Sequence, residues 1–315
     1  MFSFNFASGL ALGLAMGNSD SAYTFGPAIA ARAMRFRWAL SLCALFIIVG
    51  ALVGGEASVK TLSSLGHPTL TAAVLASLAA AFCVFSTSLL GFSPSVSQSM
   101  VGAIIGLSLI KGETNFPGLS KILLSWLATP LAGCLAALIL QTLLRWFINR
   151  LKVNIFALDK LLRTSLIVAS CYAAFALGAN NSANALAVFV ASSTLSPQAA
   201  TLGGSLSMAV GVFITSPQLL YRKVGKLVPL DSFTALVAIL AEGLAVHFFS
   251  IIGVPVSSGQ ALSGSLLGLG LYYGMQTINY KSLVKIILSW LLVPLSSGFL
   301  AASLTILVSL GGIAV

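Results

Sequence analysis

Long apolar runs alternate with short polar stretches along the whole chain, and ten apolar segments can be counted. Most are long enough for the about 20 residues that a helix needs to cross a bilayer. The pattern predicts an all-α integral membrane protein with about ten transmembrane or re-entrant segments. We expect these segments at residues 5–31, 38–54, 69–90, 94–110 and 119–145 in the first half of the chain, and at 164–195, 202–219, 233–252, 256–276 and 283–310 in the second half.

Polar residues interrupt two of the long apolar segments. The first interruption covers 17–21, and the second covers 178–184, which holds three asparagines and a serine. Glycine and asparagine disfavour a continuous helix, and an unsatisfied polar group is costly in lipid. We therefore predict helices that are broken at these two places, with the polar atoms facing protein, water or a ligand. The alternative is a hydrogen-bond cluster that only holds helices together.

The fourth apolar segment of each half opens with a turn-rich stretch. These stretches are 91–98 and 253–260, and each contains a glycine, a proline, serines and a glutamine. Because a full span needs about 20 apolar residues, we predict half-helices or re-entrant hairpins that are preceded by unwound backbone.

Matching motifs occur in the same order in the two halves of the chain. The pairs are Gly17 with Gly178, Gln98 with Gln260, and Trp126 with Trp290, at offsets of 161, 162 and 164 residues. Recurrence in one order at nearly one spacing indicates a tandem duplication. Five segments per copy is an odd number, so the second copy has to insert upside down relative to the first. We assign 1–145 to the first inverted repeat, 146–163 to a basic cytoplasmic linker and 164–315 to the second inverted repeat.

Composition supports a membrane protein and excludes other classes. The chain is 58% hydrophobic and only 7% charged, against about 25% charged residues in soluble domains. Its net charge of +10 does not indicate a nucleic-acid partner, because the basic residues lie between apolar runs. The four cysteines are scattered singly, which supports neither a zinc site nor a disulfide framework.

The distribution of basic residues predicts the orientation in the membrane. If 145–163 lies in the cytoplasm, thirteen of the 16 lysines and arginines face the cytoplasm, including those of loops 32–37 and 222–231. Basic residues favour the cytoplasmic side. Loop 195–201, the counterpart of 32–37, carries no charge, as an inverted copy requires. We therefore expect a multi-pass protein of the plasma membrane, or bacterial inner membrane, with both termini outside.

Inverted repeats with paired breaks are typical of secondary transporters, in which the breaks meet near the bilayer midplane. Amide and hydroxyl donors beside helix N-termini suit an oxyanion. The candidate substrate-binding residues are Asn18, Ser19, Ser97, Gln98, Asn180, Asn181, Ser182, Asn184, Ser257, Ser258 and Gln260. The breaks contain no lysine or arginine, so co-bound cations would have to balance the charge of an anion.

Two acidic residues are candidates for coupling transport to a cation. Asp20 is the one carboxylate in the two interruptions and the two turn-rich stretches, which together are the four breaks. We expect it to ligate sodium or accept a proton; its alternative role is a helix cap. Glu242 lies inside an apolar segment, where acidic residues indicate function. Asn181 is the neutral counterpart of Asp20 in the second copy and belongs to the same coupling group. We expect no bound cofactor other than the co-transported sodium ion or proton.

These motifs resemble a known family. Gly178 to Ala185 is similar to the repeated signature Gly-Ala-Asn-Asp-Val-Ala-Asn-Ala of the PiT-type inorganic phosphate transporters, and residues 17–34 are similar to its first copy. Residues 255–261 resemble the family's Pro-Val-Ser-Thr-Thr stretch. The resemblance implies an inverted-repeat fold that carries inorganic phosphate together with sodium ions or protons by symport.

One departure from the signature bears on the substrate. Asn181 stands where the second signature has aspartate, as in the related sulfate permeases, so a sulfate permease is the alternative function. An ion channel is a remote alternative, because channels usually form a pore from identical subunits. No zinc-protease motif, aspartate pair or nucleophile–base set indicates an enzyme. The oxyanion and the lipid bilayer are the expected partners, and a homodimer stays open.

Overall fold

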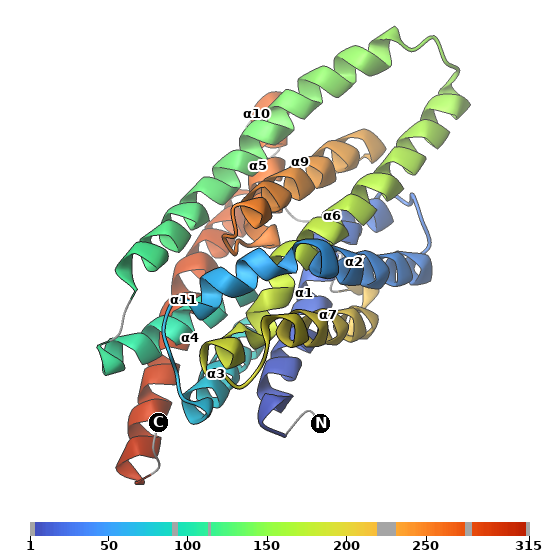
Figure 1. Cartoon of the computed structure of the whole chain (residues 1–315). Coiled ribbons are helices and arrows are strands. Elements are labelled where there is room, and N and C mark those ends of the chain that lie inside the picture. Colours follow the sequence, from blue (N-terminus) through green and yellow to red (C-terminus); the bar gives the residue numbers. More distant parts are fainter. Residues whose placement is uncertain (1–3, 90–93, 113–114, 219–230, 275–278, 313–315) are drawn as a thin grey trace.

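The computed structural model describes residues 4–89, 94–112, 115–218, 231–274 and 279–312. Within these ranges the chain forms ten α-helices and no strand (Figure 1). The helices are α1 (Ala7–Ala30), α2 (Phe36–Ser63), α3 (Leu70–Leu89), α4 (Val96–Lys111), α5 (Phe116–Arg150), α6 (Ile155–Ala191), α7 (Pro197–Ile214), α9 (Ser232–Ile251), α10 (Ser258–Tyr273) and α11 (Tyr280–Leu310). Each predicted apolar segment corresponds to one helix, which confirms the all-α prediction.

Seven of the described helices are long and apolar enough to cross a membrane: α2, α3, α5, α6, α7, α9 and α11. The prediction of a multi-pass membrane protein is confirmed. By contrast, α4 and α10 have 16 residues each, or about 24 Å, which is shorter than the about 30 Å of a hydrocarbon core. Non-helical backbone precedes both, at 94–95 and 254–257. Short helices after unwound backbone are therefore confirmed in the fourth segment of each half.

The predicted breaks at 17–21 and 178–184 are wrong. Helix α1 runs without interruption from Ala7 to Ala30, and α6 runs from Ile155 to Ala191. The asparagine side chains bond to groups on other elements instead of competing for the backbone of their own helix. Propensity alone therefore does not break the helix. The same observation excludes the helix-cap role for Asp20, which lies in the middle of α1.

The basic stretch expected to be a linker is mostly helical. Helix α5 extends to Arg150 and α6 begins at Ile155, so only 151–154 is non-helical. Asn154 caps α6 by accepting a hydrogen bond from the backbone N–H of Ala157 at 2.8 Å. The two helices form a hairpin that reaches beyond the rest of the molecule (Figure 1). The other basic loop, 222–231, lies outside the described residues except for Asp231.

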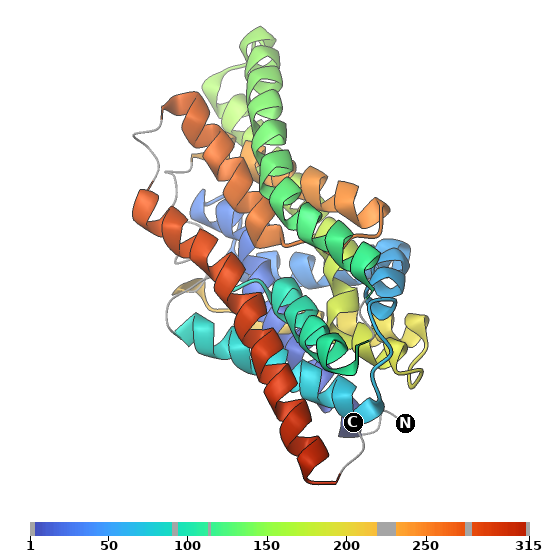
Figure 2. The same cartoon turned by 90° about the vertical axis from the view of Figure 1, so that its left-hand side faces the viewer.

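The two halves pack on each other through matching pairs of helices. Helix α2 packs on α6 and α1 packs on α7; likewise α11 packs on α4 and α10 packs on α5 (Figure 2). In chain order, α1 to α5 correspond to α6, α7, α9, α10 and α11. Replacing each helix by its counterpart turns the α2–α6 contact into the α7–α1 contact. The same replacement turns the α4–α11 contact into the α10–α5 contact. This is the contact pattern of two copies related by an approximate two-fold rotation, whereas their orientation in a membrane stays a prediction.

Glycines lie where α6 crosses α2 and where α1 crosses α7, and their contacts are also equivalent in the two halves. A Cβ atom on Gly178 would clash with the backbone carbonyl of Ile47, and one on Gly17 would clash with that of Met208. The two contacts are equivalent, because Gly178 follows Gly17, and Met208 follows Ile47, by the same 161 residues. The helices therefore cross with their backbones in contact, which brings the polar residues just after each glycine into the interface between the halves.

Candidate functional site

Asn180 fastens α6 to the extended backbone that leads into α10. Its Nδ2 donates to the carbonyl oxygen of Val254 at 3.0 Å, and its Oδ1 accepts from the N–H of Val256 at 2.9 Å. The side chain is fully buried. A buried backbone group needs a hydrogen-bond partner. The segment around Val254 and Val256 is extended but has no neighbouring strand, and the carboxamide of Asn180 provides partners for two of its backbone groups. Asn180 thus holds the unwound backbone in position.

The next turn of α6 meets α1 and α4. Asn181 Nδ2 donates to Asp20 Oδ2 at 3.2 Å, and Asn184 Nδ2 donates to Ser97 Oγ at 2.8 Å. The Ser97 hydroxyl lies 3.5 Å from Asn181 Oδ1 and 3.4 Å from the Val256 carbonyl oxygen. Four predicted site residues from three helices therefore form one buried polar cluster, which we call the central cluster: Asp20, Ser97, Asn181 and Asn184.

The N-termini of the two short helices adjoin the central cluster. Ser95 caps α4 by accepting from the N–H of Gln98, and Ser257 caps α10 by accepting from the N–H of Gln260. Ser97 lies in the first turn of α4 and belongs to the cluster. A helix N-terminus carries a partial positive charge. The two capped termini therefore contribute positive potential near buried hydrogen-bond donors.

Glu242 of α9 is a second buried carboxyl group, and its side chain is fully inaccessible. Neither oxygen has a hydrogen-bond partner within bonding distance. The groups that act on it electrostatically include the hydroxyl of Ser258, at the start of α10, and the carboxylate of Asp20. A buried carboxyl group without a partner is costly, which makes this position suited to a proton or a cation.

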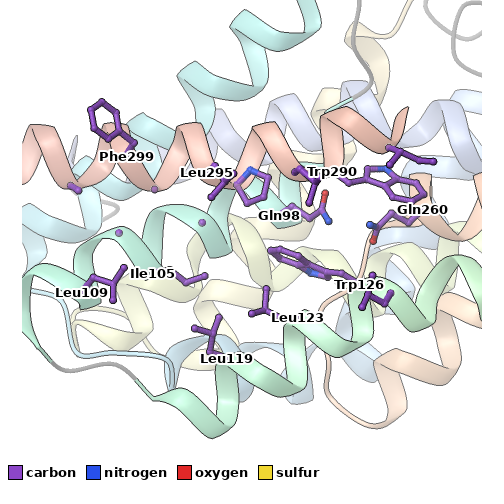
Figure 3. A pocket seen from close by; sticks show the side chains of 18 of the residues that line it. Gln98, Ile105, Leu109, Leu119, Leu123, Trp126, Gln260, Trp290, Leu295 and Phe299 are labelled. Atoms are coloured by element: carbon purple, nitrogen blue, oxygen red, sulfur yellow. The ribbon is translucent and has the colours of Figure 1, made fainter. Parts of the chain in front are cut away.

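The remaining predicted residues lie around the cluster or apart from it. The Oδ1 of Asn18 is buried without a partner, while its backbone carbonyl accepts from Thr215 at 2.9 Å. Ser19 is buried on α1 next to Asp20. Ser182 points away from the cluster, because its hydroxyl would be a neighbour of a Cβ on Gly55 of α2. Gln98 and Gln260 also lie apart from the central cluster, at one end of a cavity between α4, α5 and α11 (Figure 3).

Two features of the site were not predicted from the sequence. The backbone of Val254 and Val256 contributes a carbonyl and an N–H group, and the identity of a valine gives no sign of such a role. Tyr23 takes the position of Asn184 in the first copy, and its phenol packs against Gly259. The equal spacing of Tyr23 and Asn184, 161 residues, is the signal that could have placed Tyr23 in the site.

Within the described ranges, no group of three histidine, cysteine, aspartate or glutamate residues could hold a metal ion. A cation at the central cluster would therefore rest on one carboxylate and on neutral oxygens. Carboxylate, amide, carbonyl and hydroxyl oxygens are ligands for hard cations. Asp20, Asn181 and Ser97 provide such atoms at the interface between the halves.

The comparison with known proteins identifies the family. Residues 16–301 match the model of the phosphate transporter family. The chain belongs to this family. Its matched relatives are named as permeases or transporters, so it is a transport protein and not an enzyme. The prediction that rested on the repeated asparagine signature is confirmed.

Individual relatives extend over nearly the whole chain. A protein of Methanocaldococcus jannaschii named as a phosphate permease is 27% identical over 280 residues, which cover 89% of each chain. The sulfate permease CysP of Bacillus subtilis is 30% identical over 301 residues, which cover 92% of this chain and 84% of the permease. A solved structure described as the sodium-dependent phosphate transporter has a TM-score of 0.86 and 21% identity, and covers 97% of this chain and 98% of its own. The fold is therefore shared with that structure.

Proposed function

We propose that this protein is a secondary active transporter that carries inorganic phosphate across the plasma membrane by symport with sodium ions or protons. The observation that carries the proposal is the central cluster, a buried set of amide and hydroxyl groups at the interface between the two halves. The family membership and the likeness to a sodium-dependent phosphate transporter support it. The structural likeness supports the fold of such a carrier. The choice of phosphate as the substrate has to be argued from the site residues of this chain.

The chemistry of the site suits a tetrahedral oxyanion. The carboxamides of Asn181 and Asn184 and the hydroxyl of Ser97 can donate to anionic oxygens, and the N-termini of α4 and α10 add a favourable potential. Among the described residues, no lysine or arginine is buried. An anion in this place would thus lack a fixed positive partner, so the proposal requires a cation that binds and moves with it.

Asp20 and Glu242 are the residues that we assign to the coupling cation. Asp20 belongs to the central cluster, and Glu242 is buried on α9 with Asp20 as an electrostatic neighbour. Two buried carboxylates near each other repel, and a sodium ion or a proton would relieve the repulsion. We assign Asp20 to sodium in the first place and leave protons as the alternative ion.

Sulfate is the second candidate substrate, and one observation favours it. Asn181 replaces the aspartate of the phosphate-transporter signature, and CysP, named as a sulfate permease, is 30% identical to this chain. One carboxylate instead of two leaves one fixed negative charge fewer beside the anion. A site with one carboxylate can hold a divalent anion with fewer co-bound cations.

The alternating-access mechanism follows from the proposed architecture. We propose that the two repeats are inverted in the membrane, that both termini face outside and that 145–163 is cytoplasmic. In support, the first turn of α1 and the last turn of α11 lie at the end of the molecule opposite the α5–α6 hairpin (Figure 1). Rocking of one half against the other would then expose the central cluster to each side in turn.

Uptake into proteoliposomes tests the proposal. Radiolabelled phosphate and sulfate are offered separately, with a sodium gradient or a pH gradient imposed one at a time. We expect phosphate uptake that saturates and that needs the sodium gradient. Saturable sulfate uptake driven by the pH gradient alone would select the second candidate. Anion flux that needs no cation gradient and does not saturate would contradict both and favour a channel.

A further inference from the structure

The connection from α1 to α2 presents three arginines on the surface of the protein. Residues 31–37 comprise the turn after α1 and the first residues of α2, and Arg32, Arg35 and Arg37 are all exposed. Met34 of the same turn packs the other way, against a hydrophobic cluster formed with α6 and α9. The turn therefore has an apolar side that faces the protein and a basic side that faces outward.

A residue of α6 holds this turn in place. Arg163 donates from Nη1 to the carbonyl oxygen of Arg32 at 3.0 Å, and from Nε to Asp159 at 2.7 Å. Arg32 has a φ of 54°, in the left-handed region that commonly follows a helix. The turn lies beside α6 (Figure 1), so the basic residues of both form one surface. We call it the arginine patch, and its residues are Arg32, Arg35, Arg37, Lys160 and Arg163.

The arginine patch carries positive charge that the protein leaves unbalanced. Lys160 lies three residues before Arg163 and therefore on the same side of α6, and it is exposed. Asp159 is the acidic residue of this surface, and it is paired with Arg163. Among the residues that the structure describes, the other four members of the patch form no ion pair. A partner with negative charge is complementary to this surface.

The arginine patch adjoins the lipid-facing side of α2. Trp38, the third residue of that helix, is 66% exposed. The exposed apolar residues that follow on the same side of α2 are Leu45, Val49, Leu52 and Val53. Tryptophan is enriched at the level of lipid head groups. Trp38 therefore marks the membrane boundary of α2, and the neighbouring arginines stand at the level of the lipid phosphates.

We propose that the arginine patch binds the head group of an anionic phospholipid, with the guanidinium groups of Arg35 and Arg37 on its phosphate and its acyl chains beside Trp38. Guanidinium groups suit phosphate because two N–H groups can donate to two oxygens at once. Basic surfaces between the ends of membrane helices commonly bind such head groups. A soluble anion would use the arginines but would leave the apolar side of α2 without a partner, so the occupant is a lipid.

Native mass spectrometry of the full-length protein, freed of lipid in detergent, measures the binding. The probes are phosphatidylglycerol, which is anionic, and phosphatidylcholine, which has no net charge. We expect the first phosphatidylglycerol to bind at least tenfold more tightly than the first phosphatidylcholine. The double variant Arg35→Gln and Arg37→Gln should weaken the binding of phosphatidylglycerol at least tenfold, or about 1.4 kcal/mol, and leave that of phosphatidylcholine unchanged.

A matched variant separates the arginine patch from net charge. Lys281→Gln and Lys285→Gln together remove the same two charges from exposed positions in the first turns of α11. We expect them to change the affinity for phosphatidylglycerol less than twofold. The side chain of Arg35 makes no capping hydrogen bond to α2, and thermal unfolding without lipid checks that both double variants fold as the wild type does.

Tryptophan fluorescence locates the bound lipid without any change to the arginines. Phosphatidylglycerol that carries bromine on its acyl chains near the head group should quench the emission of Trp38. We therefore expect saturable quenching that is lost in Trp38→Phe and kept in Trp146→Phe, because Trp146 is also exposed but lies on α5.

Three results would overturn the proposal. Equal losses of affinity in the two double variants would show that net charge alone attracts the lipid. Quenching that persists in Trp38→Phe would place the lipid elsewhere. Displacement of phosphatidylglycerol by an equal concentration of glycerophosphoglycerol, its head group without chains, would show a site for a soluble anion. Because none of these measurements uses transport, failure of the proposed transport function would leave their outcome unchanged.

Discussion

Asp20 and Asn181 are equivalent residues of the two halves, and their side chains meet at 3.2 Å in the central cluster. The first has a carboxylate and the second has a carboxamide, so an approximately symmetric interface contains an unsymmetric charge. The carboxamide can donate to the carboxylate, which two aspartates could not do without a shared proton or cation. Under the proposed function, we expect this pair to decide which ions the protein carries.

Asp20→Asn should abolish cation-coupled uptake while the protein still inserts and folds. The substitution is nearly isosteric, and it removes the only charge of the central cluster, so the cation loses its charged ligand. Uptake driven by a sodium gradient and, separately, by a pH gradient measures the effect, with size-exclusion profile and thermal stability as controls for folding. Unchanged cation-dependent uptake in a folded variant would remove Asp20 from the mechanism.

Asn181→Asp adds a second carboxylate next to Asp20. Two unit charges 4 Å apart at an effective dielectric constant of about 20 interact by roughly 4 kcal/mol, and a bound cation reverses the sign of this effect. If the protein is a sodium-coupled phosphate carrier, the variant should keep transport and depend more steeply on sodium. We expect this outcome, because Asp20 and its flanking residues follow the phosphate-type signature.

The apparent affinities for phosphate and sulfate, with and without sodium, in wild type and in this variant decide between the substrates. A proton-coupled sulfate carrier with no cation at Asn181 should lose affinity for the anion tenfold or more, since about 1.4 kcal/mol is a factor of ten. A variant that loses phosphate uptake and gains no sodium dependence would therefore favour sulfate.

At the scale of elements, Asn180 connects helix α6 to the backbone before α10. We expect Asn180→Ala to lower the free energy of unfolding by about 2–6 kcal/mol, because two buried backbone groups lose their partners at about 1–3 kcal/mol each. Thermal unfolding in detergent measures the loss. The matched control is Asn154→Ala on the same helix, whose exposed cap is worth about 1 kcal/mol. Equal effects of the two substitutions would show that the contacts of Asn180 contribute little.

The sequence predicted the helices well, because lipid-spanning apolar runs depend on composition over many residues. It predicted short helices after unwound backbone in the fourth segment of each half because the glycine, proline and serine residues before each one are turn signals. It failed at Asn180 and Asn181, where the partners of the side chains are on distant segments and the helix therefore stays intact. It also ended the neighbouring segments at 145 and 164, whereas α5 extends to Arg150 and α6 begins at Ile155, because basic residues are as compatible with the exposed ends of two helices as with a connecting segment.

The site was predictable only as far as side-chain chemistry reveals it. Asp20, Ser97, Asn181 and Asn184 carry polar groups in an apolar context, and this contrast marks them. The backbone groups of Val254 and Val256 have no such mark, because every residue has them and only the fold makes two of them available. Ser182 faces α2 instead of the central cluster, and this depends on which side of α6 meets α2, which periodicity alone left open.

At the scale of the molecule, the two halves exchange equivalent contacts, and the long helices define two ends. Helix α6 has 37 residues, which span about 55 Å at 1.5 Å per residue, well beyond the about 30 Å of a hydrocarbon core. Because α6 is continuous, Ile155 at its start and Gln198 just after its end should lie on opposite sides of a membrane that the helix crosses. The hairpin end carries basic residues of α5 and α6, and the opposite end carries the uncharged connection 192–196 between α6 and α7.

These features predict which side of the membrane each end faces. In a background with the four native cysteines replaced, a cysteine at Gln198 should react with a membrane-impermeant thiol reagent added outside intact cells. A cysteine at Ile155 should react only after the membrane is permeabilised. Both positions are exposed, so burial does not limit the reaction of either. Labelling of both from outside would contradict a membrane-spanning α6, whereas labelling of Ile155 alone would reverse the orientation and remove the charge argument for a cytoplasmic 145–163.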